Sequence, residues 1–156
     1  MKLINGLGVT LLLGTAVWTG TTLQANAKTL TWHAGTPKSL RKTWYHNGAG
    51  DNKAYITYSA TKSTGNLLQA TNAKTTYAKL PGYGLKKLKY QALGHHVYRL
   101  SGIQYSPKGS TVQFDGQRLT YQVKVVSKHQ LHFYKGYAKY VTNPAFKVVA
   151  LKQLTR

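Results

Sequence analysis

The sequence predicts an all-β fold: a small antiparallel β-barrel or barrel-like sandwich of about eight to ten short strands after a signal peptide. Three observations support this prediction. From Lys28 onward several segments alternate apolar and polar residues, and no segment keeps helical periodicity. Turn sequences rich in Gly, Asn and Pro separate these segments at short intervals. Tyrosine, which favours strands, occurs 12 times.

The first element is expected to be a signal peptide over residues 1–27. Lys2 supplies a positive charge, an apolar run extends from Leu7 to Trp18, and the small residues of Ala25-Asn26-Ala27 are typical of a cleavage site. A membrane anchor would need about 20 mostly apolar residues, and the Gly and Thr residues within the run weaken that alternative. We therefore expect a secreted, extracellular protein that begins at Lys28.

The remaining chain is expected to form a single β domain over residues 37–156, preceded by a short N-terminal extension over residues 28–36. A chain of this size can bury roughly two-thirds of the surface that its unfolded form exposes. The sequence contains no cysteine. This excludes disulfides, thiolate metal ligands and a thiol nucleophile, so the core alone must stabilise the fold.

Three segments have the clearest strand pattern. In Arg118–Val126, one face would carry Leu119, Tyr121, Val123 and Val125, and the other Arg118, Thr120, Gln122 and Lys124. Lys53–Ala60 and Lys87–Ala92 alternate in the same way. Weaker strands are expected at Leu67–Tyr77 (as one strand or two), His96–Ile103, Thr111–Phe114, Gln130–Tyr134, Tyr137–Thr142 and Phe146–Lys152.

Turns are expected where Gly and Asn can supply positive φ or Pro can preset a corner. Asp115-Gly116, between two alternating runs, is the clearest two-residue hairpin turn. The other predicted turns are Asn47-Gly48, Thr64-Gly65-Asn66, Leu80-Pro81-Gly82, Ser106-Pro107-Lys108-Gly109 and Asn143-Pro144.

The segment TPKSLRKTWYHNG, Thr36–Gly48, combines a proline-led turn with positive charge and an aromatic pair. Pro37 would fix the turn, and Leu40 and Trp44 are expected to point into the interior at the start of the barrel. Arg41 would lie on the opposite face. Trp44 is therefore expected to be a core residue.

A longer stretch, TWHAGTPKSLRKTWYHNG, resembles the start of a group of small secreted proteins from lactic acid bacteria. In that group a signal peptide is followed by Trp-His-x-Gly-Thr-Pro-Lys-x-Leu-Arg-x-Thr-Trp. The segment HHVYRLSG, His95–Gly102, is a second similarity. The resemblance implies secretion and an all-β domain and implies no activity. The matching positions here are Trp32, His33, Gly35, Thr36, Pro37, Lys38, Leu40, Arg41, Thr43 and Trp44.

The same segment also looks like the start of a lipocalin or related calycin barrel, in which Gly-x-Trp begins the first strand. This sequence has Lys42 at the glycine position. In that family the Trp closes the barrel floor against a late basic side chain, for which Lys147, Lys152 and Arg156 are the candidates. The resemblance implies a fold only, with the carriage of a small apolar ligand as an alternative function.

Charge is the feature that bears most on function. The chain has 22 Lys and Arg residues against 2 Asp and Glu, a net formal charge of +20. Only Lys2 precedes Lys28, so the expected secreted part has one charge less. Such an imbalance favours polyanionic partners. Four of the cations are Arg, and the excess of Lys favours diffuse attraction over bidentate recognition, so no specific nucleic acid is expected.

Basic residues cluster beside aromatic residues in three places. We expect these clusters to attach the protein, without a covalent bond, to anionic cell-wall polymers or a membrane surface. The sequence leaves the oligomeric state open. The candidate polyanion-binding residues are Lys38, Arg41, Lys42, Lys86, Lys87, Lys89, Lys135 and Lys139.

Catalytic and metal-binding patterns are weak, so we expect no enzyme, cofactor or metal. Asp51 and Asp115 each adjoin a glycine and are expected to form turns. No Gly-x-Ser-x-Gly motif is present. His95 and His96 would point to opposite faces of a strand, as would His129 and His132.

Overall fold

The computed structural model describes residues 29–50, 52–107, 116–133 and 138–151. These residues form strands joined by short turns, together with one short 3₁₀ helix, η1. The elements are β1 (His33–Ala34), η1 (Lys38–Leu40), β2 (Thr43–Asn47), β3 (Lys53–Tyr58), β4 (Ser63–Ala70), β5 (Thr76–Lys79), β6 (Tyr83–Gly94), β7 (Val97–Tyr105), β8 (Arg118–Ser127), β9 (Gln130–Phe133), β10 (Lys139–Val141) and β11 (Lys147–Ala150).

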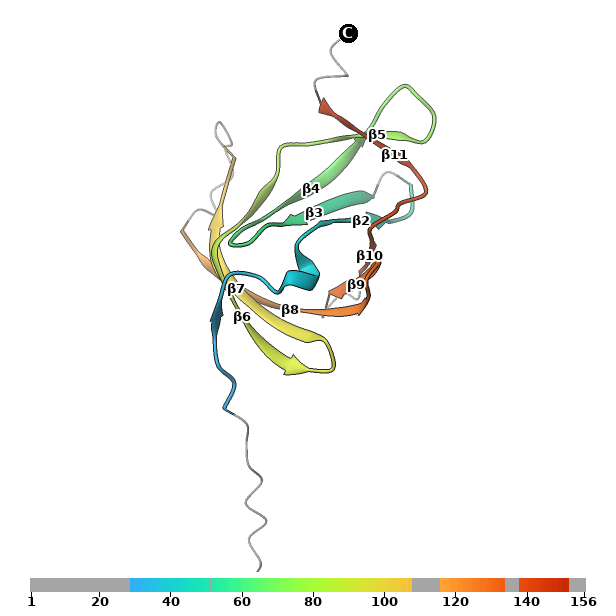
Figure 1. Ribbon diagram of the computed structural model, residues 1–156. Coiled ribbons are helices and arrows are strands. Elements are labelled where there is room, and N and C mark those ends of the chain that lie inside the picture. Colours follow the sequence, from blue (N-terminus) through green and yellow to red (C-terminus); the bar gives the residue numbers. More distant parts are fainter. Residues whose placement is uncertain (1–28, 51, 108–115, 134–137, 152–156) are drawn as a thin grey trace, which may run out of the picture.

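Eight of the strands close into an antiparallel barrel in the order β2-β3-β4-β6-β7-β8-β9-β10 (Figure 1). Two non-sequential pairings complete the ring. Tyr140 of β10 lies opposite His46 of β2, and Ser63 of β4 lies opposite Leu85 of β6. The predicted all-β barrel is confirmed.

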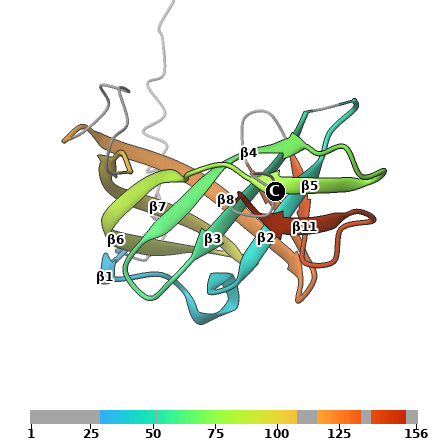
Figure 2. The same cartoon turned by 90° about the horizontal axis from the view of Figure 1, so that it is seen from above.

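Three strands extend the sheet outside this ring. β5 pairs with the end of β4, and β11 runs parallel to β5, so both lie to one side of the barrel (Figure 2). β1 pairs with β6, where His33 lies opposite Tyr90. The segment predicted as an extension, residues 28–36, therefore contributes a strand to the folded sheet, and Thr36 is 1% exposed.

η1 crosses one end of the barrel and joins β1 to β2. Leu40 is fully buried there, and its carbonyl accepts a hydrogen bond of 3.0 Å from Nε1 of Trp44, which is also fully buried. The backbone N–H of Thr36 donates to the carbonyl of Ala60 at 2.9 Å, so the segment is bound to the β3–β4 turn. Pro37 precedes η1, as expected for a residue that presets the turn. The predicted interior positions of Leu40 and Trp44 are confirmed.

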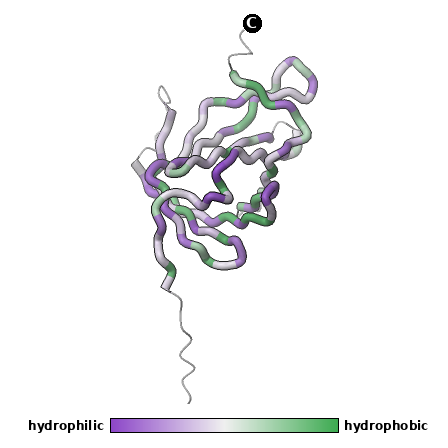
Figure 3. The backbone as a smooth tube through the Cα atoms, viewed as in Figure 1, coloured by the Kyte–Doolittle hydropathy of each residue, from purple (hydrophilic) through white to green (hydrophobic). Residues whose placement is uncertain are grey.

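The barrel core follows the alternation of the strands. Hydrophilic and hydrophobic positions alternate along the tube through β6–β9 (Figure 3). In β8, Val123 is fully buried and Tyr121 and Val125 pack against the core, as the sequence predicts. The buried cluster consists of Leu40, Trp44, Tyr58, Leu85, Leu88, Leu100, Val123 and Leu131.

Three local predictions are wrong. His129 lies in the turn between β8 and β9 and not on a strand. Thr64-Gly65-Asn66 lies within β4 and not in a turn. A Cβ on Gly65 would lie 2.5 Å from the carbonyl oxygen of Tyr55, so glycine serves close strand packing here. His95 and His96 do not lie on a strand: both have positive φ, 49° and 60°, and they form the two-residue turn between β6 and β7.

Other turns agree with prediction. Asn47 ends β2 and Gly48 follows it, Leu80-Pro81-Gly82 joins β5 to β6, and Asn143-Pro144 lies between β10 and β11. Gly116 has a positive φ of 89°, but Asp115 and the predicted strand Thr111–Phe114 lie outside the described residues.

Of the three candidate cations for the calycin-like contact with the floor tryptophan, the structure describes only Lys147. Lys147 begins β11, outside the barrel ring, and Lys152 and Arg156 lie outside the described residues. The cation over the ring of Trp44 is Lys42, with its Nζ 5.3 Å from the ring centroid.

The β5–β11 pair is attached to the barrel wall by lysines packed on aromatic rings. Nζ of Lys79 lies 5.0 Å from the ring centroid of Tyr55, and Nζ of Lys53 lies 4.9 Å from that of Tyr77. Phe146 packs edge-on against Tyr77 at 5.2 Å. These two lysines therefore serve packing between layers.

Candidate functional site

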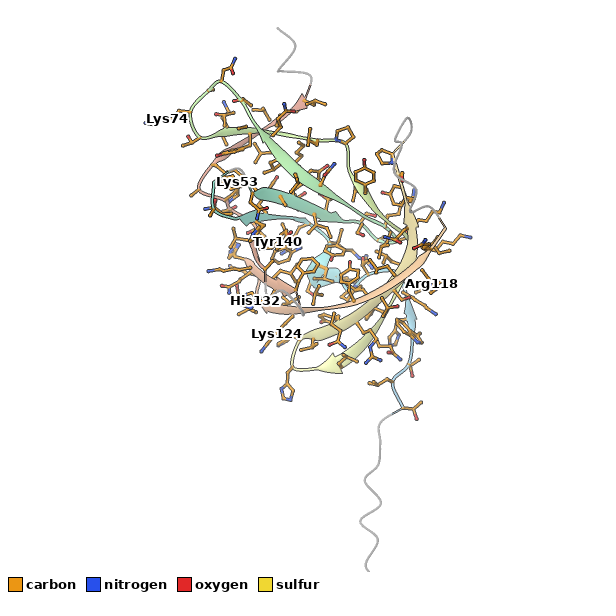
Figure 4. The ribbon with its side chains drawn as sticks, turned by 180° about the vertical axis from the view of Figure 1, so that it is seen from behind. Lys53, Lys74, Arg118, Lys124, His132 and Tyr140 are labelled. Carbon is orange, nitrogen blue, oxygen red and sulfur yellow. The ribbon has the colours of Figure 1, made fainter. Side chains whose placement is uncertain are left out.

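The outer face of β6–β10 is a cationic wall. On these strands the core residues Leu100, Val123 and Leu131 face inward, so the residues next to them in sequence face outward. Figure 4 shows Lys124 and His132 near one end of β8 and Arg118 at its other end, whereas Lys53 and Lys74 lie away from this face. The wall consists of Lys86, Lys89, Arg99, Arg118, Lys124, His132 and Lys139.

Uncharged polar residues on neighbouring strands orient the two arginines of the wall. Nη1 of Arg118 donates to Oγ of Ser101 at 3.3 Å, and Nη1 of Arg99 donates to Oε1 of Gln91 at 3.0 Å. None of the described residues is an Asp or a Glu. The positive charge of the wall is therefore not neutralised by any carboxylate within the described part of the chain.

The predicted basic cluster beside Trp44 is largely structural. Nε and Nη2 of Arg41 both donate to the carbonyl oxygen of Thr36, at 3.1 and 2.9 Å. Nζ of Lys42 donates to the carbonyl of Lys128 at 3.0 Å. Lys38 is exposed in η1. These three residues lie at the closed end of the barrel and not on the cationic wall.

The predicted basic cluster on β6 does not lie beside its aromatic neighbours, because they face opposite sides of the sheet. Lys86 and Lys87 are exposed, whereas Tyr90 packs against the core on the inner face. The basic and aromatic residues of this cluster therefore do not share one surface on the outside of the barrel. Lys87 has a positive φ of 52° and lies in a β-bulge between Lys86 and Lys89. The bulge lets the core residues Leu85 and Leu88 both face inward although they are three residues apart.

Two of the predicted basic residues lie on the edge strands of the wall. Lys89 packs on an aromatic ring that the sequence did not indicate, with its Nζ 4.7 Å from the ring centroid of Trp32. Lys139 is exposed on β10, and Lys135 lies outside the described residues. Sequence reasoning missed four members of the wall as site residues: Arg99, Arg118, Lys124 and His132. The alternation in β8 already placed Arg118 and Lys124 on one polar face, but their neighbours depend on strand pairing.

The barrel also contains a cavity of about 420 Å³ at the end opposite η1. Its lining among the described residues has no charged side chain. The apolar part is formed by Ala54, Ile56, Leu67, Leu85, Leu119 and Phe133, and the polar part by Ser63, Asn66, Tyr83, Gln104, Tyr105 and Tyr140. The barrel is thus filled at one end and hollow at the other.

A chain of hydroxyl groups lies beneath this cavity. The hydroxyls of Tyr58 and Tyr121 are 2.8 Å apart, and Ser63, which lines the cavity, also hydrogen-bonds to Tyr121. Burial raises the pKa of Tyr121 to about 12, because the ionised phenolate would be poorly solvated. Burial raises the pKa of Tyr58 as well, and to a smaller extent that of Tyr140.

The histidines are separated in the fold. His46 stacks on Tyr140 with ring centroids 5.2 Å apart, and Nδ1 of His129 bonds to Oγ1 of Thr142 at 2.8 Å. In the described ranges, no group of three His, Asp or Glu side chains could hold a metal ion. Nor does this part of the chain contain a helix with the length and apolar character needed to cross a membrane.

Comparisons with known proteins found no relative of this chain. No protein-family model, no curated protein and no solved structure matches this chain. The cationic wall and the cavity are therefore the two features of the structure that bear on its function.

Proposed function

We propose that this protein is a non-enzymatic, secreted β-barrel that attaches by charge to the anionic cell envelope. Phosphate groups, of wall polymers or of lipid headgroups, are the chemistry that it would meet. The observation that supports the proposal most directly is the cationic wall, which carries six Lys and Arg side chains and no described carboxylate. Lysine-rich surfaces of this kind attract phosphate through long-range Coulomb forces.

The strength of such attraction depends on salt. Binding to a phosphate polymer releases condensed counter-ions, so affinity falls steeply as salt concentration rises. Exposed charges are screened beyond about 8 Å at physiological ionic strength. Attachment should therefore be strong in dilute buffer and lost in molar salt.

The experiment is co-sedimentation of the purified protein, lacking residues 1–27, at increasing salt. One arm uses isolated walls that contain phosphate polymers, and the same walls after the polymers have been extracted. The other arm uses vesicles of phosphatidylglycerol, with phosphatidylcholine vesicles as control. Loss of binding on polymer extraction identifies the wall, and binding to the anionic vesicles alone identifies the lipid. Binding that persists in molar salt would contradict the proposal.

A second candidate function is the carriage of a small neutral molecule in the barrel cavity. Its volume of about 420 Å³ lies within the range of ordinary ligand pockets, about 300–1,000 Å³. The described lining is uncharged in a strongly cationic protein, which favours a neutral ligand with an apolar body and a few hydroxyl groups. Leu40 and Trp44 fill the other end, so the ligand would enter from the cavity side.

Fluorescence titration with a neutral apolar dye tests this second function. Ala54 lines the cavity, so Ala54→Phe should fill part of it and weaken dye binding. Ala60→Phe places the same ring at an exposed position and serves as control. Equal dye binding by both variants and the parent protein would exclude the cavity as the binding site.

A further inference from the structure

Three strands of the cationic wall align their basic side chains in one row. Lys124 of β8 lies opposite His132 of β9, and His132 lies opposite Lys139 of β10. Lys124 and Lys139 are exposed, and His132 is partly exposed. We call these three residues the Lys124–His132–Lys139 row. Its members come from sites up to fifteen positions apart in sequence but occupy adjacent strands.

The row concentrates positive charge. Neighbouring strands are about 4.8 Å apart, which places the two lysine Cα atoms roughly 10 Å from each other with the imidazole between them. Like charges on adjacent strands destabilise a sheet, and the described residues contain no carboxylate to offset them. An anion above His132 would contact all three side chains and relieve their mutual repulsion.

The hydrogen bond between His132 and Gln130 can exist with the imidazole neutral or protonated. Nε2 of His132 lies 2.8 Å from Nε2 of Gln130, an arrangement in which the amide donates to a neutral imidazole. Rotation of the Gln130 amide by half a turn would present its oxygen, which accepts a hydrogen bond from a protonated ring. The charged groups that face His132 from the adjacent strands are Lys124 and Lys139. Protonation therefore keeps the hydrogen bond and adds a third positive charge to the row.

We propose that the Lys124–His132–Lys139 row holds a phosphate group of the anionic polymer, and that His132 takes up a proton when the phosphate binds. This inference rests on the proposed function, and it replaces diffuse attraction over the whole surface by one preferred contact. Lysine binds phosphate as a point charge, and protonated imidazole adds an N–H donor between the two ammonium groups.

Two double variants of equal charge test the location. Lys124→Gln/Lys139→Gln removes the lysines of the row, and Lys62→Gln/Lys74→Gln removes two exposed lysines in turns elsewhere. The probe is inorganic polyphosphate, with affinity measured by calorimetry in dilute buffer. We expect the row variant to bind about tenfold more weakly and the control variant to change by about twofold or less. Thermal unfolding checks that each variant is folded.

The same titration at two pH values tests the proton. Because a protonated imidazole adds a positive charge and an N–H donor to the row, the parent protein should bind polyphosphate more tightly in mildly acidic than in mildly alkaline buffer. His132→Gln should abolish most of this difference, while His95→Gln, in an exposed turn, should keep it. A pH dependence that survives His132→Gln would overturn the role of His132.

The remaining outcomes separate the inference from the proposed function. Equal weakening of both double variants would overturn the row and leave general charge attraction in place. Failure of the parent protein to bind polyphosphate, walls or anionic vesicles in dilute buffer would overturn both.

Discussion

The hydroxyl oxygens of Tyr58 and Tyr121 lie 2.8 Å apart inside the barrel, although 63 positions separate the two residues in the sequence. The pair joins β3 to β8 across the interior and lies between the packed end and the cavity. An apolar barrel interior would solvate a phenolate poorly. Ionisation of either hydroxyl would therefore destabilise the folded state relative to the unfolded chain, in which the phenolate is hydrated.

The first prediction is a loss of stability in alkali. Burial raises the pKa of Tyr121 to about 12 from its ordinary value of 10.0. A group with a raised folded pKa stabilises the fold fully below its unfolded pKa, and this contribution is lost as pH rises through the folded value. At about 1.4 kcal/mol per pKa unit, the free energy of unfolding should fall by roughly 3 kcal/mol between about pH 10 and 12.

Urea denaturation at a series of pH values measures this loss. The control is Tyr58→Phe/Tyr121→Phe, which removes both hydroxyls and should flatten the alkaline dependence. Lysine deprotonation occurs in both proteins and cancels in the comparison. Identical curves for the parent and the double variant would show that these tyrosines are not the buried titrating groups.

The second prediction concerns the closed end of the barrel. Leu40 is fully buried at the closed end of the barrel, next to Trp44. Leu40→Ala should leave a cavity and lower the free energy of unfolding by about 2–5 kcal/mol. Leu30→Ala, at a position that is 41% exposed, should change it by about 0.5 kcal/mol or less. Similar denaturation midpoints for the two variants would argue against η1 as part of the core.

The third prediction concerns the turn between β6 and β7. His95 and His96 both have positive φ, a conformation that Asn-Gly adopts with less strain. His95→Asn/His96→Gly should therefore stabilise the protein by about 1 kcal/mol in thermal unfolding. The same replacement at Lys128-His129, a turn without positive φ, should bring no gain. A gain at both turns would point to a general effect of removing positive charge.

The fourth prediction concerns Gly65 in β4. A Cβ there would lie 2.5 Å from the carbonyl oxygen of Tyr55 and 3.2 Å from Cα of Ile56. Because both atoms belong to the backbone of β3, Gly65→Ala should force the strands apart and cost about 2 kcal/mol or more. Gln69→Ala, at an exposed position of the same strand, is the control. Unchanged thermal stability of Gly65→Ala would contradict this packing.

The fold could be predicted because alternation is a local property of the chain. The inward faces of β3 and β8 and the core positions of Leu40 and Trp44 were all predicted from the sequence. Gly65 was misassigned because glycine marks both turns and tight strand contacts. His95-His96 was misassigned because two histidines with positive φ are unusual, and the hairpin register imposes that conformation.

The candidate site was less predictable because it depends on register. The chosen lysines were close to aromatic residues in sequence, but the β-bulge at Lys87 changes the side to which the following residues point, so Lys86 and Tyr90 lie on different surfaces. Lys124, His132 and Lys139 come together only through the pairing of β8, β9 and β10. Such pairings could not be read from one sequence.

The pairing of β2 with β10 also affects how the protein must fold. Val141 lies opposite Tyr45, so the ring closes only when segments from near the two ends of the described chain meet. Proteins dominated by such distant contacts fold slowly. A chain still lacking β10 would leave β2 and β9 with unpaired backbone groups, which are templates for aggregation. Folding intermediates of this barrel would therefore be the species most in need of protection by a chaperone.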